Sequence, residues 1–501
     1  MMAQKQDFLK ARQQFDRLCE LVRQAGREGW RMDEIERELM PRLMWLGREF
    51  LEGHVQAQGN GDVGPTVTSD DGTLRRSKKL HSRRYLSAFG ELVIARYVYA
   101  VREGQKAEYV PLDARLGLPA GENSYLLEDW QQRLSVKDSF GESVDDLKAI
   151  LGHGVSVRTA EGMNRAMAAH AEGYRAAQPL PPPKEEAELL VVTADGKGVV
   201  MRRPVEKQLQ DEATAKARSE KKGKHKTGKK QMAYVGAVYT IDRFRRTAND
   251  VLDEMARRSR AEARPRPQHK RVWAEMTRVL EGEPCTGREL LFCNLAVECE
   301  QRNSSGKKTL ICLLDGERSL WDMQRGWFPQ AIGILDIFHV SERIWEVAHC
   351  VYARGSDAAR EFATRHLRMI LEGKVGYVLR NWRPLADKYE WRGEKRTTVM
   401  AAITYFENNR EHMRYNEYMA AGYPIGSGVA EGTCRHLVKD RMELTGMRWE
   451  VAGAQAMLHT RAIHINGEWD QFVAYRVEKE QDALYGPGTL YETLTYYTQP
   501  A

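Results

Sequence analysis

The sequence lacks any apolar run long enough to cross a bilayer. Of its 501 residues 29% are charged, the mean hydropathy is −0.59, and no stretch of about 18 consecutive apolar residues occurs. Residues 1–12 are polar, so the apolar core of a secretory signal is missing as well. These absences predict a protein without a membrane span, located in the cytoplasm.

Cysteine is scarce, and its spacing does not match a binding motif. The seven cysteines include no Cys-x-x-Cys pair, and the closest two are Cys293 and Cys299. An odd and dispersed set argues against a disulfide framework and against a structural zinc site. A reducing compartment is the natural setting for such a chain.

Basic residues are concentrated in one run, although the net charge of +7 is modest for this length. Residues 216–230 are nearly all basic, and their single apolar residue is Ala217. Such a run cannot pack into a core and is expected to form a surface loop. Its lysines are either solvated or candidate contacts to the phosphate backbone of a nucleic acid. The candidates are Lys216, Lys221, Lys222, Lys224, Lys226, Lys229 and Lys230.

The first part of the chain is predicted to be mainly helical. Apolar residues at helical spacing predict helices over about 4–25 and 32–52. Residues 56–71 are rich in Gly, Asp and Thr and are expected to be loose. Residues 85–101 have the β-branched and aromatic content of a hairpin, with Gly90 near its middle.

Three short helical stretches follow the predicted hairpin. They cover about 123–135, 141–151 and 156–172, and the last two are separated by the glycine-containing turn 152–156. A short turn of this kind is typical of helix-turn-helix units, and an ordinary three-helix packing unit is the alternative. The polar residues expected to project from the last helix are Arg158, Asn164 and Arg165.

The stretch Pro179–Pro183 is a stiff polyproline-type linker that divides the chain. On this basis we predict five regions. They are an N-terminal helical region (1–82), a candidate DNA-binding region with hairpin and helix-turn-helix-like helices (83–178), the linker (179–187), a core containing the basic loop 216–230 and helical insertions (188–475), and a C-terminal tail (476–501).

Beyond the linker, strands alternate with helices, and acids occur at the strand ends. The apolar segment 188–200 is expected to deliver Asp195 to its end and then to turn at glycine. Two later apolar strands end in Asp315 and Asp336. The other elements expected here are a strand at about 232–241, helical sequence to about 302, a strand at 309–316, a helix at 318–327 and a strand at 331–339.

This order of elements is that of a ribonuclease-H-like α/β core, in which central strands present acids at one edge of the sheet. A later helix supplies the last acid in that arrangement. Each Asp alone has an ordinary alternative as a helix N-cap or turn residue.

A glycine-rich turn before a helix provides the candidate for that last acid. Ser427 is the expected N-cap, and Glu431 lies about one turn inside the helix, in line with an apolar stripe. A carboxylate that faces inward is costly unless it is paired, protonated or bound to a metal. A first-turn glutamate that merely favours the helix N-terminus is the alternative. The stripe consists of Cys434, Val438 and Met442, and the neighbouring cations are Arg435, Lys439 and Arg441.

Two aspartates and one glutamate on rigid elements suit a pair of Mg²⁺ ions, because this hard cation prefers carboxylate oxygens and retains several waters. Two such ions stabilise both the attacking and the leaving oxygen in phosphoryl transfer.

The chain resembles bacterial insertion-sequence transposases of the ISKra type, within the Mutator-like group of DDE transposases. The similarity extends over about residues 85–475, and its last block is very specific. The blocks that carry it are Ala194–Gly198, Leu314–Gly316 with Trp321, Ile334–Val340, Tyr405–Arg410 with Met413 and Tyr415, Pro424–Glu431, Met447–Trp449 and, more weakly, Pro111–Gly117.

The resemblance implies a catalytic and metal-binding triad of Asp195, Asp315 and Glu431. Asp336 remains an alternative second acid, since Asp336 and His339 resemble an Asp-x-x-His element of the same group. His339 also has a structural alternative as part of an aromatic cluster. Glu317 departs from the common pattern, in which a small residue or proline often follows Asp-Gly.

The implied function is a DNA transposase that binds the ends of its element and catalyses metal-dependent strand cleavage and strand transfer. The implied cofactors are two Mg²⁺ ions, which Mn²⁺ would replace, and the implied partners are double-stranded DNA and further copies of the chain on DNA. The expected DNA contacts outside the basic run are Arg158, Arg165, Arg435 and Lys439. The alternatives are an inert, domesticated DNA-binding regulator and a metal-dependent structure-selective nuclease.

Overall fold

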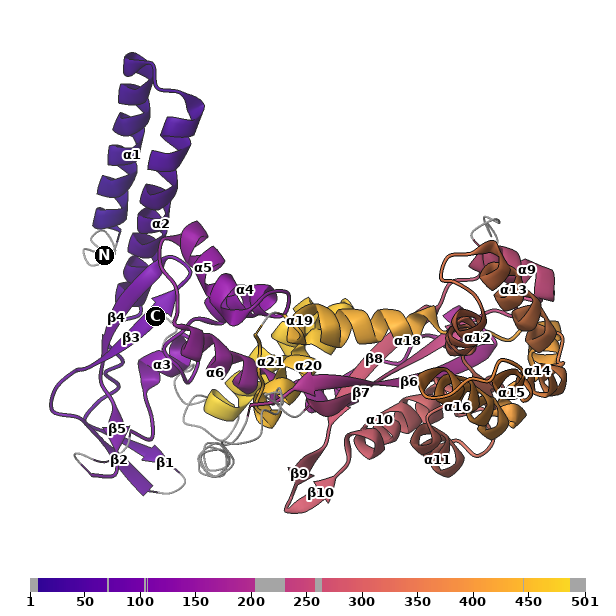
Figure 1. Cartoon of the computed structure of the whole chain (residues 1–501). Helices are drawn as coiled ribbons and strands as arrows, with labels where there is room; N and C mark the ends of the chain where they lie inside the picture. Colours follow the sequence, from indigo (N-terminus) through magenta and orange to yellow (C-terminus); the bar gives the residue numbers. More distant parts are fainter. Residues whose placement is uncertain are drawn as a thin grey trace, which may run out of the picture. The chain divides into compact units, whose positions relative to one another are not determined.

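The computed structural model describes residues 8–69, 72–102, 105, 107–202, 230–256, 264–444 and 446–486. The chain forms two compact units, one of Met1–Tyr174 with Trp469–Ala501 and one of Arg175–Glu468 (Figure 1). In these ranges, every helix is too short or too polar to cross a membrane. Of the predicted basic loop, only Lys230 lies within the described residues; Lys216, Lys221, Lys222, Lys224, Lys226 and Lys229 lie outside them.

A helical hairpin opens the first unit. Helix α1 (Leu9–Glu28) ends at Gly29, whose φ of 69° is a left-handed conformation that glycine adopts without strain. Helix α2 (Met32–Ala57) follows and packs along α1 (Figure 1). The two predicted helices are confirmed, and α2 is longer than expected.

Small antiparallel sheets follow the hairpin. Strand β1 (Thr66–Ser69) pairs with β2 (Gly72–Arg76), which pairs with β5 (Tyr99–Ala100). The prediction of a loose segment over 56–71 is therefore wrong for β1, because Val67 pairs with Leu74, which is buried. The predicted hairpin is present as β3 (His81–Ser87) and β4 (Gly90–Arg96), turning before Gly90.

Short helices complete the first unit. The serines Ser124, Ser139 and Ser156 each cap a helix by accepting a hydrogen bond from a backbone N–H in its first turn. The helices are α3 (Pro111–Arg115), α4 (Tyr125–Ser135), α5 (Phe140–Leu151), α6 (Val157–Ala168), α7 (Ala171–Ala177), which spans the unit boundary, and α21 (Trp469–Tyr485).

Two expectations for these helices need revision. Asn164 does not project from α6: it is 1% exposed, and its amide donates to Gln132 Oε1 at 3.1 Å. A polar side chain in the core needs such a partner. The predicted tail over 476–501 begins inside α21, where Arg476 is buried and paired with Glu128 and Glu480.

A mixed five-stranded sheet organises the second unit. Its strand order is β12-β11-β6-β7-β8. Strand β6 runs parallel to β11 and antiparallel to β7, β11 runs parallel to β12, and β7 runs antiparallel to β8. The bounds are β6 (Leu189–Val200), β7 (Lys230–Ile241), β8 (Gln268–Met276), β11 (Thr309–Leu314) and β12 (Ile332–Leu335).

Two sequence expectations for this sheet are wrong. Strand β6 does not turn after Asp195: it continues through two glycines to Val200, because β7 pairs with it along its whole length. The segment expected to be helical up to 302 contains β8, whose residues 272–276 are buried in the sheet. Among the described residues of this stretch, the helices are α9 (Ala248–Met255) and α10 (Gly287–Arg302), with the small hairpin of β9 (Arg278–Leu280) and β10 (Glu283–Cys285) between them.

Helices cover the sheet and extend the second unit. Helix α10 packs on β7 and β8, and α20 packs on β8. One continuous apolar core joins the sheet to the helices that follow it. These are α11 (Arg318–Trp327), α12 (Ile337–Val351), α13 (Asp357–Leu371), α14 (Val375–Trp382), α15 (Leu385–Lys388), α16 (Glu394–Asn408), α17 (Tyr415–Ala420) and α18 (Gly428–Thr433). Helices α19 (Asp440–Met442) and α20 (Val451–Ile465) complete the unit.

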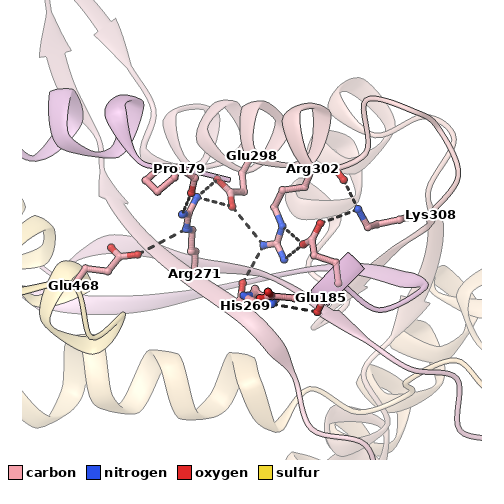
Figure 2. A network of polar contacts seen from close by, with 9 residues as sticks. Pro179, Glu185, His269, Arg271, Glu298, Arg302, Lys308 and Glu468 are labelled. Carbon is pink, nitrogen blue, oxygen red and sulfur yellow. Dashed lines mark hydrogen bonds and ion pairs between the residues drawn. The ribbon is translucent and has the colours of Figure 1, made fainter. Parts of the chain in front are cut away.

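The proline-rich linker is fastened to the second unit by a buried ionic network (Figure 2). The Arg302 side chain is fully buried; its Nε donates to Glu186 at 2.6 Å, and Lys308 donates to the same carboxylate at 2.8 Å. Arg271 donates to the carbonyl of Pro179 at 2.7 Å and also pairs with Glu298. Residues 179–186 are therefore anchored to β8 and α10, not free in solvent.

Candidate functional site

Three acids lie side by side across three parallel strands, at the point where β11 and β12 end and β6 continues. The register aligns Ala194 of β6 with Leu314 of β11, and Leu314 with Leu335 of β12. Neighbouring strands lie about 4.8 Å apart, so the residues that come next occupy one row along the sheet edge. These next residues are Asp195, Asp315 and Asp336.

Asp195 and Asp315 interact electrostatically in this row. Burial raises the pKa of Asp315 to about 6; the amide of Glu317, which donates to it at 2.8 Å, opposes the shift, and the charge of Asp195 adds to it. Two neighbouring carboxylates repel, and partial burial strengthens that repulsion. A cation between them would remove this cost.

Asp336 has a different role, because both of its oxygens accept backbone hydrogen bonds. One accepts from the amide of Phe338 at 2.8 Å and caps α12; the other accepts from the amide of Ser427 at 2.9 Å. Its side chain is buried, which raises its pKa despite these two bonds. Asp336 thus links the end of β12 to the turn that begins α18.

Glu431 lies on α18, next to this link. Ser427 caps the helix as expected, accepting from the amide of Ala430 at 2.8 Å. Glu431 is exposed and lines an open pocket of about 480 Å³ along α12. The other residues that line this pocket are Phe338, Ser341, Glu342, Trp345, Glu346 and His349.

The expectation that Glu431 lies on the apolar stripe is wrong, and the reason is a change of helix type. Residues Cys434–Lys439 form a π-helix, which has more residues per turn than an α-helix and so rotates the stripe away from Glu431. Cys434, Val438 and Met442 are buried, whereas Glu431 faces solvent. Arg441 is also fully buried, with its guanidinium 5.2 Å from the ring centre of Trp449.

Across the described ranges, no group of three or more His, Cys, Asp or Glu side chains is arranged to hold a metal ion. The structure brings Asp195 together with Asp315, and it places Glu431 near Asp336, whose pKa the charge of Glu431 helps to raise. Glu431 does not join the first pair. Mutual repulsion of carboxylates opposes a three-acid cluster that no cation neutralises.

The π-helix places a thiol beside the first acid. Burial raises the pKa of Cys434, and the adjacent Asp195 carboxylate raises it further by its charge and by accepting a hydrogen bond from the thiol. The cysteine is therefore a neutral neighbour of the acid pair. Lys197, two residues after Asp195 on β6, lies 3.9 Å from Glu443 and brings a positive charge to the same region.

Several motif residues hold the strand ends in place, a role that sequence reasoning did not assign. The hydroxyl of Tyr405 donates to the carbonyl of Asp315 at 2.5 Å, and Tyr415 donates to the carbonyl of Leu335 at 2.7 Å. Asn409 accepts from the indole of Trp321 at 2.6 Å and donates to the carbonyl of Gly316. The only sequence signal for this role was that these residues belong to the motif blocks that resemble the transposase family.

The closing motif also has a structural role. The backbone of Trp449 donates to Val200 at 3.0 Å and accepts from Arg202 at 2.7 Å, which fixes it to the end of β6. Its indole donates to the carbonyl of Met442 at 3.2 Å. Trp449 therefore ties the acid-bearing strand to the segment that follows the π-helix.

The weaker N-terminal block is explained by a buried ion cluster in the first unit. Asp113 of α3 accepts from Arg83 and from Arg96, each at 2.7 Å, and is 5% exposed. Because these arginines come from β3 and β4, the block fastens the hairpin to α3.

The predicted DNA contacts are exposed where the structure describes them. Arg158 and Arg165 lie two turns apart on α6, and both are exposed. Arg435 and Lys439 are exposed on the π-helix, and Arg435 lies 3.7 Å from Asp440. Lys230 begins β7 and lies 3.9 Å from Glu443.

His339 lies on the first turn of α12, near the acids. Its positive form would lower the pKa of both Asp315 and Asp336. The ring is partly exposed, and its Nδ1 lies 3.2 Å from Glu342. This contact joins His339 to an acid on its own helix.

Comparison of the sequence with models of known protein families gave no match, and comparison with curated proteins gave none either.

Proposed function

We propose that this chain is a DNA transposase, which binds the ends of an insertion sequence and catalyses metal-dependent strand cleavage and strand transfer. One observation carries the proposal: Asp195 and Asp315 are neighbours at one edge of a sheet ordered β12-β11-β6-β7-β8. Three antiparallel strands followed by two strands parallel to the first is the arrangement of a ribonuclease-H-like core, and it supports that assignment here.

The donors at this edge fit a hard divalent cation. Asp315 is partly buried, its pKa is raised, and it lies next to Asp195. The two carboxyl groups together offer several oxygens, and their negative charges repel each other. Mg²⁺ prefers such oxygens, and Mn²⁺ accepts them too. We assign Asp195 and Asp315 as ligands and Glu431 as the third acid; two bound Mg²⁺ ions would stabilise the attacking and leaving oxygens of the phosphoryl transfer.

Asp336 supports the site as a positioning residue in this proposal. Its carboxylate is already occupied by the amides of Phe338 and Ser427, so it has little capacity left for a metal. By holding Ser427 it fixes the start of α18 and hence the approach of Glu431. His339 belongs to the same supporting group.

Double-stranded DNA, both element ends and target, is the proposed partner. The exposed cations Arg158 and Arg165 on α6, and Arg435 and Lys439 beside the acids, would contact phosphates, together with the basic run 216–230. We also propose that the protein acts as a homo-oligomer on DNA, in the cytoplasm and associated with the nucleoid.

One observation favours a second candidate, a DNA-binding protein with an inert core. The exposed Glu431 does not join Asp195 and Asp315. Helix α18 already packs on β6 and β7, so a competent enzyme requires only that the Glu431 side chain turn toward the acid pair. A nuclease, the third candidate, would cut DNA without joining ends.

The decisive experiment is incubation of the purified chain with Mg²⁺ and the genomic flanks of its encoding element, followed by sequencing of the junctions. We expect cleavage at fixed ends and joining of the 3′ ends to target DNA. The Asp195→Asn variant serves as a matched control, since it keeps shape and loses charge. Cleavage without joining would indicate a nuclease, and binding without cleavage would indicate an inert core.

A further inference from the structure

The α1–α2 hairpin carries an apolar face that no described part of the chain covers. Its seam is filled by small and apolar residues of α1, namely Ala11, Leu18 and Ala25, which are 1%, 6% and 2% exposed. A second set of large apolar side chains remains in solvent. Its members are Phe15 (55% exposed), Val22 (45%), Met32 (72%), Leu43 (49%) and Phe50 (47%).

Four of these side chains form one face, whereas the other exposed apolar side chains of the hairpin do not share their spacing; these are Leu9 (51% exposed), Met40 (45%) and Trp45 (44%). Phe15 and Val22 are seven residues apart on α1, and Leu43 and Phe50 are seven apart on α2, so each pair follows one side of its helix. Phe8, seven residues before Phe15, contacts Phe50 with ring centres 6.1 Å apart. The two stripes therefore meet on the same side of the hairpin.

The charges on the two helices are complementary. Helix α1 has five Lys and Arg residues against three Asp and Glu, whereas α2 has three basic residues against six acidic ones. The net charges are thus +2 and −3. Any arrangement that places α1 of one hairpin on α2 of another is electrostatically favoured.

We propose that this face binds the same face of a second copy of the chain, so that the two hairpins form an antiparallel four-helix bundle. A two-fold axis parallel to the helices places α1 of each copy against α2 of the other, with every neighbouring pair antiparallel. Heptad-spaced apolar residues then meet across the interface. The association requires no DNA and does not depend on the proposed catalytic activity.

Charge also argues against other occupants of this face. A nucleic acid or an anionic membrane surface requires an excess of cations. The hairpin instead carries one more acid than bases over α1 and α2. A self-complementary surface of mixed charge fits a copy of itself.

The test is sedimentation velocity of the full chain without DNA, at micromolar concentration. We expect a particle of twice 57.4 kDa for the wild type. One variant combines Phe15→Glu with Val22→Glu, and a second combines Leu43→Lys with Phe50→Lys. Each alone should sediment as a monomer, because charges face apolar residues in both halves of the bundle. Val93→Glu, at a 65% exposed position of β4, is the matched control and should remain dimeric.

Mixing the two variants tests the pairing itself. In the proposed bundle, the acidic α1 of one variant meets the basic α2 of the other, while the remaining two helices are both unaltered, so the mixture should regain the dimer. Circular dichroism should show unchanged helix content; if it does not, Phe15→Gln with Leu43→Gln replaces the charged variants and must also give monomers. A monomeric wild type, dimeric variants or a mixture that stays monomeric would each overturn the proposal.

Discussion

At the scale of single residues, two aspartates at neighbouring strand ends differ in what their oxygens already bind. Asp336 accepts from two backbone amides, whereas Asp315 accepts from the amide of Glu317 and lies beside Asp195. Hydrogen bonds that satisfy a carboxylate stabilise its charged form, and an adjacent carboxylate destabilises it. Asp336, whose oxygens already accept hydrogen bonds, is suited to positioning other groups. Asp315, which is repelled by Asp195, is suited to binding a cation.

Asp315 should lower the stability of the metal-free protein at neutral pH. Its pKa is about 6 in the folded state, against about 4 in the unfolded chain. The contribution of Asp315 to the free energy of unfolding is therefore largest below about pH 4, and it is lost as the pH rises through about 6. In a chelator-containing buffer, Asp315→Asn should add on the order of 1–3 kcal/mol at about pH 7.5 and little at about pH 4.

Denaturant unfolding at the two pH values measures this effect. Asp357→Asn makes the same chemical change at a side chain that is 88% exposed and should leave stability unchanged. A destabilised Asp315→Asn protein at neutral pH would contradict the assignment of a repulsive acid pair.

The second acid can be identified by its response to metal concentration. As a direct ligand, Asp315 should lose nearly all cleavage activity on change to Asn, at any Mg²⁺ or Mn²⁺ concentration. Asp336→Asn, like His339→Ala, should cost about 10–100-fold and recover partly at high metal, as expected for a group that orients a ligand. Titration of the cleavage rate with Mn²⁺ distinguishes them; the reverse pattern would make Asp336 the ligand.

At the scale of elements, buried polar contacts fix loops that the sequence presents as free. The linker is held by Glu186, which accepts from the fully buried Arg302 and from Lys308. Removing one partner from such a network leaves an uncompensated charge in the interior.

Arg302→Met should destabilise the second unit by about 3–5 kcal/mol, because Glu186 and Glu298 lose their shared partner. Arg325→Met, on the exposed face of α11, removes a surface pair with Asp322 and should cost less than about 1 kcal/mol. Urea unfolding of both variants decides the matter, and equal losses would show that the network does not anchor the linker.

We predict that the lysines of the basic run 216–230 contact DNA together. Changing its lysines to glutamine should weaken binding about equally for all sequences and flatten the slope of log K against log salt, since fewer counterions are released. Fluorescence anisotropy across a salt series measures both quantities. The control is the double variant Lys388→Gln with Lys395→Gln, which changes two exposed lysines outside the run. If the glutamine variant of the run leaves the slope of log K against log salt unaltered, the run is only a solvated loop.

At the scale of the whole molecule, DNA binding and chemistry are assigned to different sets of residues. The exposed cations Arg158 and Arg165 lie in the first unit, whereas Asp195, Asp315 and Glu431 lie in the second. Loss of an acid should therefore leave recognition of element ends intact.

Asp195→Asn and Glu431→Gln should each abolish strand cleavage while changing the affinity for element ends by less than about threefold, because each substitution keeps shape and removes one metal-binding charge. Gel-shift and cleavage assays on the same DNA compare the two properties. Full cleavage by Glu431→Gln would exclude this residue as the third acid and leave Asp195 and Asp315 as the assigned ligands.

The sequence by itself predicted the elements whose signals are local. Periodic apolar residues located α1 and α2, a glycine located the β3–β4 turn, and apolar runs ending in Asp located β11 and β12. Ser427 was recognisable as an N-cap because that hydrogen bond spans only three residues. The sequence also predicted that Asp195 and Asp315 follow apolar strand segments, whereas the pairing of β6 with β11 that makes them neighbours comes from the structure.

The tertiary structure decided what depends on distant partners. Strand β6 continues past Asp195 because β7 pairs with it, and β8 is a strand because the sheet buries it. Asp336 joins β12 to the start of α18 because it accepts a hydrogen bond from the amide of Ser427, which is remote in sequence. Asn164 is buried because it donates a hydrogen bond to Gln132, on another helix. The apolar residues after Glu431 turn away from it at a π-helix, Cys434–Lys439, whose extra residue per turn has no local sequence signature. Local patterns determine which element forms, but the free energy that orients a polar side chain comes from contacts that only the folded chain creates.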